Sequence, residues 1–296
     1  MPKVAIVTDS QSSLPRRLIG QYGIRIVPIT ICVDGRTYMD EVDLTVEQVR
    51  RRFDRMARFT TGTPSPGFFA GAFREAAAET NDVACALLSA AMSGTYDSAV
   101  RGREIACSDN PKLNIEIVDS RTSIGGVGFI ALEGARAAAA GKDLGGVVAV
   151  MRDMVGRVRW LNGLDTTARV SRNGRVPESV SRTATLHEMR IIGQTLGTGR
   201  VEDFGKCEGR EELFRRMVEI VGEKSAAGLP LHVIVHYMNR IEDGRRLLRM
   251  VKAAYRCVET YLAPYPASIA GLAGPSTGIS FFSGPVEIPL PLDGGG

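Results

Sequence analysis

The segment Ser93-Gly94-Thr95-Tyr96 combines small hydroxyl side chains with a glycine, a pattern that suits the binding of an anion. It lies between an apolar run over 83–88, which we predict to be a buried strand, and a predicted helix over 95–107. Backbone N–H groups at a helix start have no partner within the helix, and flanking hydroxyls add further donors. Gly94 would let an anion approach the backbone closely. The alternative, if the segment is read alone, is that Ser93 simply caps the helix that follows.

A second hydroxyl-rich segment, Thr60-Thr61-Gly62-Thr63-Pro64-Ser65-Pro66, precedes another predicted helix. One interpretation is a loop followed by a helix cap, with Ser65 before an early proline. The other is functional, because two hydroxyl-rich loops on one sheet would let a carboxylate accept several hydrogen bonds. Each charge-assisted bond contributes roughly 1.5–3 kcal/mol.

Three predicted strands end in hydroxyl and acidic side chains. The run over 4–7 ends in Thr8-Asp9-Ser10, the run over 83–88 ends in Ser89, and the run over 113–118 ends in Asp119-Ser120. Ligands of an open parallel sheet bind beyond the carboxyl ends of its strands. We therefore expect the three strand ends to share one rim. Acidic side chains close to Ser93 in a polar pocket would favour an enzyme.

Other motifs that could suggest catalysis or metal binding do not indicate such a function here. Gly274-Pro275-Ser276-Thr277-Gly278 matches the hydrolase nucleophile elbow, but in that fold the histidine follows the serine, and here every histidine precedes it. No Walker-type phosphate loop and no metal-binding spacing is present. We interpret the histidines as structural: His187, His232 and His236. We interpret Gly125-Gly126-Val127-Gly128 as a helix start that packs closely on a sheet.

The elements that position these residues alternate between strand and helix over the first 140 residues, which predicts a parallel sheet covered on both faces. We predict one strand over 24–33, with an irregularity at Pro28. Beyond Trp160 the pattern changes, and Gly197-Thr198-Gly199 between two short strands predicts a hairpin. The fold class is therefore α/β with two domains. We expect a Rossmann-like parallel-sheet domain over 1–156 and a two-layer α/β domain over 157–296.

Composition excludes several classes of protein. The chain has 296 residues and a formal net charge of +4, which is too small to indicate binding of nucleic acid. Its five cysteines are odd in number and form no Cys-x-x-Cys pair, which indicates a reducing cytoplasm and no structural zinc. No run of 18 apolar residues suggests a membrane span, and the first residues lack a signal-peptide layout.

Taken together, the motifs resemble the DegV family of bacterial fatty-acid-binding proteins. The resemblance covers most of the chain and rests on the order and spacing of six short segments. They are Thr8-Asp9-Ser10-Gln11-Ser12-Ser13-Leu14, Thr61-Gly62-Thr63-Pro64-Ser65-Pro66, Ser89-x-x-Met92-Ser93-Gly94-Thr95-Tyr96, Val118-Asp119-Ser120 with Gly126-x-Gly128, Leu164-Asp165-Thr166, and Arg172-Asn173-Gly174-Arg175-Val176.

The resemblance implies a carrier without cofactor that holds one long-chain fatty acid. It implies that Thr61 and Ser93 hydrogen-bond the carboxylate with help from the backbone N–H of Gly94, and we count Thr95 with these ligands. Arg175 matches an arginine of the family that faces the head group or a partner. That partner is a separate ATP-dependent fatty-acid kinase, which makes an acyl phosphate. We expect a monomer or weak dimer.

The chain departs from the family near its end. Where the family has Gly-x-His-Thr-Gly-Pro-Gly, this chain has Gly271-Leu272-Ala273-Gly274-Pro275-Ser276. Leu272 stands at the position of the histidine, which lies by the head group in the family and matters for transfer to the kinase. The loss of this histidine is compatible with lipid binding. Without the histidine, the resemblance no longer implies that the bound acid is passed to a kinase.

Two other functions remain open from the residues. One is a transferase that acts on a small carboxylate or phosphate at the same rim, with Asp9 and Asp119 near Ser93. The other is a divergent member that acts through protein contacts. Energetics favour a lipid, because a buried methylene contributes about 0.8 kcal/mol and ~15 of them would contribute roughly 12 kcal/mol before ordering costs.

Overall fold

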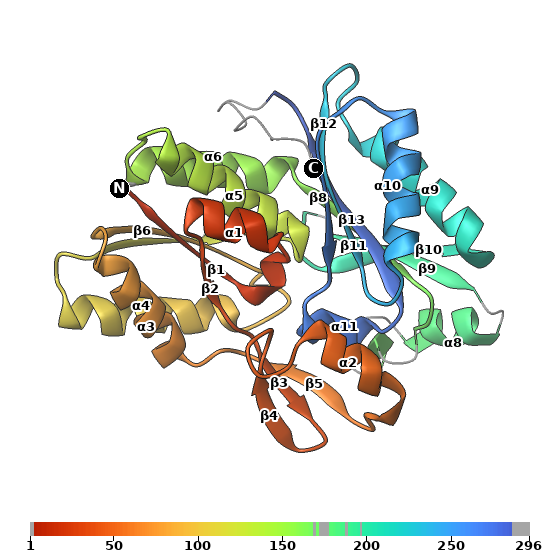
Figure 1. Cartoon of the computed structure of the whole chain (residues 1–296), viewed down its shortest axis with the longest axis horizontal. Coiled ribbons are helices and arrows are strands. Elements are labelled where there is room, and N and C mark those ends of the chain that lie inside the picture. Colours follow the sequence, from red (N-terminus) through yellow and green to blue (C-terminus); the bar gives the residue numbers. More distant parts are fainter. Residues whose placement is uncertain (1–2, 168–169, 172–177, 187–188, 196, 286–296) are drawn as a thin grey trace.

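The computed structural model describes residues 3–167, 170–171, 178–186, 189–195 and 197–285. Within these ranges the chain forms three sheets with helices packed around them (Figure 1). The predicted α/β class and the parallel sheet in the first half of the chain are confirmed, and the structure shows a mixed sheet in the second half.

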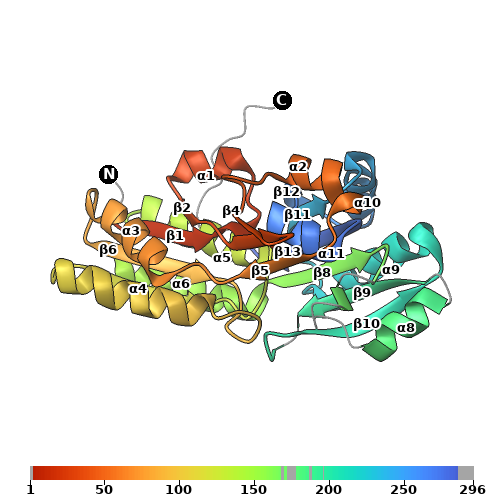
Figure 2. The same ribbon diagram turned by 90° about the horizontal axis from the view of Figure 1, so that it is seen from below.

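The first sheet is parallel, with the strand order β2-β1-β6-β7 among the described residues. The central strands β1 and β6 are almost wholly buried and apolar, so both faces of the sheet need a cover. Helices α1, α5 and α6 cover one face and α3 and α4 the other (Figures 1 and 2). The bounds are β1 (Ala5–Asp9), η1 (Ser10–Ser12), α1 (Arg16–Tyr22), β2 (Arg25–Val27), α3 (Pro66–Ala77), β6 (Asp82–Leu87), α4 (Thr95–Asp109), β7 (Asn114–Asp119), α5 (Gly125–Ala139) and α6 (Leu144–Arg157).

The strand that we predicted over 24–33 is two strands in different sheets. It breaks at Pro28, which has no N–H for a sheet ladder. The next residue, Ile29, donates its N–H to Ser10 Oγ at 3.0 Å. The chain then leaves the parallel sheet and forms a small antiparallel sheet of order β4-β3-β5. This unit contains β3 (Thr30–Val33), β4 (Arg36–Met39), α2 (Val46–Arg52), η2 (Phe53–Arg55) and β5 (Phe59–Gly62).

The second large sheet has the order β10-β9-β8-β13-β11-β12 in the described part of the chain. Strands β11 and β12 are parallel, and the other neighbours are antiparallel. Helices α9 and α10 cover one face (Figure 1). The predicted hairpin is confirmed as β9 and β10. The bounds are β8 (Arg159–Leu164), α8 (Glu178–Leu186), β9 (Arg190–Thr195), β10 (Val201–Cys207), α9 (Gly209–Lys224), β11 (Leu231–Tyr237), α10 (Ile241–Ala254), β12 (Cys257–Pro264), α11 (Ala267–Ala273) and β13 (Ser276–Ser283).

Sequence analysis did not identify β8, β12 or β13. Strand β13 combines glycine and serines with strong strand formers such as Ile279 and Phe281, and it is buried between β8 and β11. The proposed division of the chain at residue 157 falls at the last residue of α6, two residues before β8.

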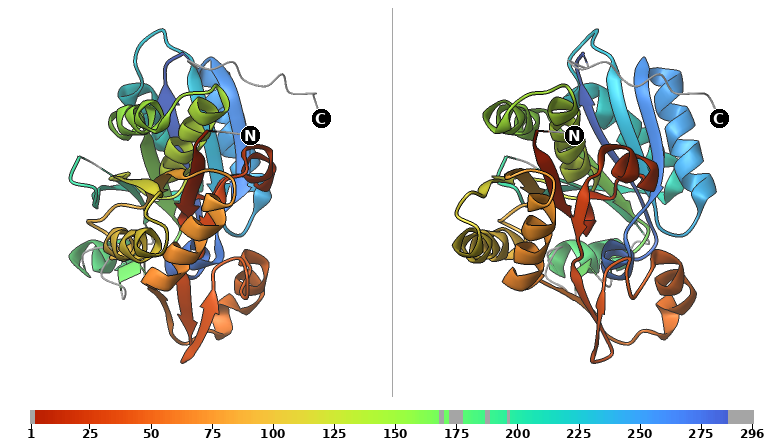
Figure 3. Two further views of the ribbon diagram at one scale, coloured as in Figure 1. Left: turned by 90° about the vertical axis from the view of Figure 1, so that its left-hand side faces the viewer. Right: turned by 60° about the vertical axis from the view of Figure 1, so that its left-hand side comes forward.

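Helix α5 joins the two large sheets. A Cβ atom on Gly125 would collide with His236 of β11 and Ser280 of β13, and one on Gly128 would collide with the backbone of Ser12. The predicted close packing of this glycine-rich helix start is therefore confirmed. Helix α11 makes the other junction, because it follows β12 in the chain and packs on α2 and β5 of the small sheet (Figure 3).

Candidate functional site

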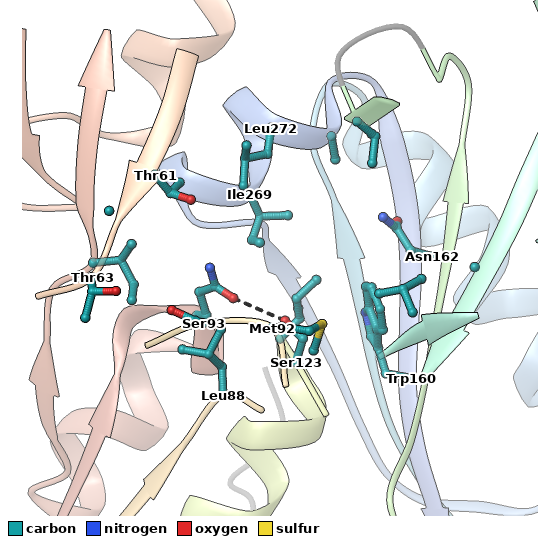
Figure 4. Close-up of a pocket in the computed structure, with 18 of the residues that line it drawn as sticks. Thr61, Thr63, Leu88, Met92, Ser93, Ser123, Trp160, Asn162, Ile269 and Leu272 are labelled. Carbon is teal, nitrogen blue, oxygen red and sulfur yellow. Dashed lines mark hydrogen bonds between the residues drawn. The ribbon is translucent and has the colours of Figure 1, made fainter. Parts of the chain in front are cut away.

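A cavity of about 290 Å³ lies where the parallel sheet, the small sheet, α11 and β8 meet (Figure 4). This volume is at the lower end of the range for small-molecule pockets. Most of its lining is apolar: Ile29, Leu88, Met92, Ile124, Trp160, Leu164, Val170, Val201, Ile269, Leu272 and Ala273. The polar side chains in the lining are Gln11, Thr61, Thr63, Ser93, Ser123 and Asn162. No charged side chain lines the pocket within the described ranges.

The hydroxyl groups of the pocket come from two segments that lie side by side. Thr61 is on strand β5, where it pairs with Ile31, so the expectation of a loop at this residue was wrong. Ser93 and Gly94 form the turn before α4. A Cβ atom on Gly94 would lie 3.3 Å from Thr63 Oγ1, which explains why a glycine suits this close approach.

The structure places the predicted site residues as follows. Thr61, Ser93 and Gly94 line the same pocket. Thr95 is fully buried, and its Oγ1 lies 2.8 Å from Ser93 Oγ, so it contacts Ser93 from behind and does not line the pocket. Arg175 lies outside the described residues.

The three strand ends of the parallel sheet do form one rim. Asp9 Oδ2 accepts a hydrogen bond from the N–H of Leu88 at 2.8 Å, and Asp9 Oδ1 accepts one from the N–H of Gln11 at 2.9 Å. Asp119 Oδ1 accepts hydrogen bonds from the N–H groups of Ala90 and Arg121 at 3.1 and 3.0 Å. Both carboxyl groups therefore bind backbone beside the pocket and do not line it. Burial raises the pKa of Asp9 to about 7, although its two backbone hydrogen bonds act to lower it.

Gln11 and Ser123 were missed as site residues. Ser123 Oγ donates to Gln11 Oε1 at 3.2 Å on the pocket wall (Figure 4). Gln11 lies within the motif that follows β1, so its position in the sequence could have identified it as a site residue. Ser123 precedes Ile124, which has a φ of 56° that β-branched residues rarely adopt. This strained turn brings Ser123 and Ile124 to the pocket at the start of α5.

Two helices begin at the hydroxyl end of the pocket. α4 begins at Thr95 and α5 begins at Gly125, and neither has a side-chain cap hydrogen bond. The N-terminal ends of helices carry a partial positive charge and favour anions. This end of the pocket is therefore suited to a carboxylate without any cationic side chain in its described lining.

Helix α11 forms part of the apolar wall, and a buried carboxyl group holds it there. Asp40 Oδ1 accepts from the N–H of Ser268 at 2.9 Å, and Asp40 Oδ2 accepts from the hydroxyls of Ser268 and Ser10, each at 2.6 Å. Burial raises the pKa of Asp40 to about 6. The positions that depart from the family pattern, Leu272 and Ala273, both line the pocket.

The described histidines are structural, as predicted. His232 Nδ1 lies 2.8 Å from Glu259 Oε2, and its Nε2 lies 3.1 Å from the carbonyl oxygen of Gly284. His236 is wholly buried, with Nδ1 3.1 Å from Ser13 Oγ, and burial lowers its pKa to about 3. His187 lies outside the described residues. Ser276 Oγ donates to the carbonyl of Gly274 at 2.9 Å, so the elbow-like motif serves the start of β13.

The fold and the site together define an α/β protein of three sheets, with a mainly apolar pocket where the sheets meet and neutral hydrogen-bond donors at one end of that pocket. The family model of DegV, described as an uncharacterised protein family, matches residues 3–284. The chain belongs to the DegV family. Among the described helices, none combines the length and the apolar character that a membrane span requires.

Relatives of known sequence or structure match nearly the whole chain. A DegV domain-containing protein of Caldanaerobacter subterraneus is 29% identical over 91% of this chain and 98% of its own. A Thermus thermophilus DegV family protein, described as binding fatty acid, has a TM-score of 0.85 and 26% identity, covering 96% of this chain and all of that chain. The Streptococcus pneumoniae Fatty Acid Kinase (Fak) B3 protein, loaded with linoleic acid, has a TM-score of 0.83. At 18% identity, over 95% of this chain and 99% of that chain, it is similar in fold.

Proposed function

We propose that this protein binds one long-chain fatty acid, with the carboxylate at Thr61 and Ser93 and the acyl chain along the apolar wall of the pocket. The observation that carries the proposal is the lining itself, in which hydroxyl side chains gather at one end and apolar side chains make up most of the rest (Figure 4). An amphipathic carboxylate has the same distribution of polar and apolar groups.

The head group would be held by neutral donors. Hydroxyls of Thr61 and Ser93, and the backbone N–H of Gly94, lie near the N-terminal ends of α4 and α5. Ser93 is oriented by Thr95, whose N–H donates to Ser93 Oγ at 3.3 Å. Each hydrogen bond to a carboxylate contributes roughly 1.5–3 kcal/mol. These bonds would set the orientation of the ligand.

The acyl chain would supply most of the affinity. Burial of a methylene contributes about 0.8 kcal/mol, so a long chain exceeds the head group in total. A pocket that relies on apolar contact can release its ligand without breaking an ion pair. That property suits a carrier. The description of the Thermus thermophilus relative as a fatty-acid-binding protein supports the proposal.

Mass spectrometry of an organic extract of the purified, denatured protein tests this function. We expect a fatty acid in near-stoichiometric amount. Ser93→Ala should lower its content, and Ser108→Ala should not, because Ser108 is an exposed residue of the same helix that bonds only the carbonyl of Glu104. A clean extract from the wild-type protein, with no uptake of added fatty acid, would contradict the proposal.

We further propose a fatty-acid kinase as the partner, on the basis of the family resemblance. Leu272 gives the pocket wall an apolar side chain at the position of the family histidine. We expect a Leu272→His variant to support formation of acyl phosphate by such a kinase faster than the wild-type protein does. An equal rate for the two proteins would show that this position does not control the coupling.

A further inference from the structure

Strand β8 presents a mixed wall to the pocket. Side chains alternate between the two faces of a strand, so Trp160, Asn162 and Leu164 point to one side. All three line the pocket, and Figure 4 shows Trp160 and Asn162 on its wall. On the other face, Leu161 belongs to the buried cluster around α9. An amide therefore stands in the apolar wall between an indole and a leucine, on a different element from Thr61 and Ser93.

The Asn162 amide has a fixed orientation. The hydroxyl of Tyr265, which is fully buried, donates to Asn162 Oδ1 at 2.7 Å. Gly278, the neighbour of Asn162 on β13, provides the space for this hydroxyl, since a Cβ atom there would collide with it. On the other side, the neighbour on β9 is Gly193, which also lines the pocket. With Oδ1 occupied, the Nδ2 group of Asn162 faces the pocket (Figure 4).

Two donors on this wall lack acceptors among the described residues. Asn162 is only 6% exposed, and its Nδ2 has no hydrogen-bond partner there. Trp160 is 5% exposed, and its Nε1 is buried without a partner. Buried polar groups in native proteins are almost always paired, and an unpaired one is costly. The Asn162 amide nitrogen, unlike the indole nitrogen, is still open to the pocket, so an acyl chain made only of methylenes would cover it and leave it unpaired.

We propose that the pocket selects an acyl chain that carries an oxygen acceptor, a hydroxyl or ketone group, part of the way along its length, and that Asn162 Nδ2 donates to this oxygen. The inference rests on the proposed fatty-acid-binding function and names the class of fatty acid. A polar site that hydrogen-bonds a substrate group discriminates strongly against the analogue that lacks the group. Asn162 is thus a specificity-determining residue at a distance from the carboxylate.

Competition binding with octadecanoic acids tests the proposal. The probes are stearic acid and a series that carries one ketone at successive positions, because a ketone oxygen accepts and cannot donate. We expect at least one mid-chain isomer to bind wild-type protein about tenfold more tightly than stearic acid. If stearic acid binds and no ketone isomer binds more tightly, the present inference is overturned and the fatty-acid function stands. If no acid of the series binds, both are overturned.

A pair of variants assigns the effect to the amide. Tyr265→Phe keeps Asn162 and should retain the preference for the ketone. The double variant Asn162→Leu with Tyr265→Phe removes both partners and leaves no unpaired hydroxyl, so it should bind stearic acid at least as well as the ketone. A double variant that still prefers the ketone would overturn the role of Asn162. The wild-type comparison decides the proposal even if the double variant does not fold.

Discussion

The two ends of α5 border two buried regions of opposite character. Near its N-terminus lies the pocket, whose described lining is uncharged. Near its C-terminus, Arg136 is 1% exposed and binds Glu133 of its own helix and Glu259 of β12. His232 and Tyr261 also bind the Glu259 carboxylate. Burial opposes ionisation of Glu259, but the hydrogen bonds from His232 and Arg136 outweigh it and hold its pKa at about 2.

The difference lies in whether the polar groups are satisfied by the protein. In the ion network around Arg136, nearly every polar atom has a protein partner, with the Nε of Arg136 as an exception. In the pocket, donors such as Asn162 Nδ2 have no acceptor among the described residues. The first region fixes the helix against the second sheet. The second region has hydrogen-bonding capacity left for a ligand.

The largest expected effect comes from breaking the ion network. Arg136→Met should lower the free energy of unfolding by about 3–5 kcal/mol, because it leaves buried carboxylates without a counter-charge. Urea unfolding measures this loss. The matched control is Arg74→Met, since Arg74 and Asp109 form an exposed pair worth about 1 kcal/mol or less. Equal losses for the two variants would contradict the assigned role of the network.

A change in the pocket should affect binding and leave folding nearly intact. Thr61→Val keeps the shape of the side chain and removes a donor to the carboxylate, so fatty-acid affinity should fall by roughly 1.5–3 kcal/mol. Displacement of a fluorescent fatty acid measures the change. Thr60→Val is the control, because Thr60 is the preceding residue of β5 and does not line the pocket. The role of Thr61 fails if both variants bind with unchanged affinity.

The contributions of two buried carboxyl groups to stability, Asp9 beside the pocket and Glu259 in the ion network, should depend on pH with opposite signs. Asp9 has its pKa raised from 3.8 to about 7 in the folded state, so the folded protein keeps a proton that the unfolded chain loses. Its contribution to stability therefore falls as the pH rises from about 4 to about 7, with a slope of at most about 1.4 kcal/mol per pH unit. The pKa of Glu259 is lowered from 4.5 to about 2 in the folded state. Its contribution to stability therefore increases as the pH rises from about 2 to about 4.5.

Unfolding free energies measured at several pH values check this prediction. Asp9→Asn should flatten the fall between about pH 4 and pH 7, and Glu259→Gln should flatten the rise below about pH 4.5. An unchanged slope in Asp9→Asn would show that Asp9 does not titrate in the folded protein as proposed.

Local patterns predicted the elements whose signals are confined to short stretches. Alternating strands and helices indicated the parallel sheet, and the turn Gly197-Thr198-Gly199 indicated the hairpin of β9 and β10. The order of strand ends also indicated the rim at Asp9, because parallel strands point their carboxyl ends to the same edge. Ser93 and Gly94 were found in this way, since they lie in the short segment between β6 and α4.

Only the tertiary structure decided the rest of the site. The sequence around Asn162 has no clear strand pattern, and β8 was not predicted. Asn162 lines the pocket because β8 pairs with β9 and β13 and faces β5 across the cavity. Arg136 and Glu259 meet although 123 residues separate them. Such contacts depend on how sheets and helices pack, and local propensity carries no information on that packing. The sequence by itself determined the α/β class and the hydroxyl end of the pocket, whereas packing between the sheets determined its opposite wall.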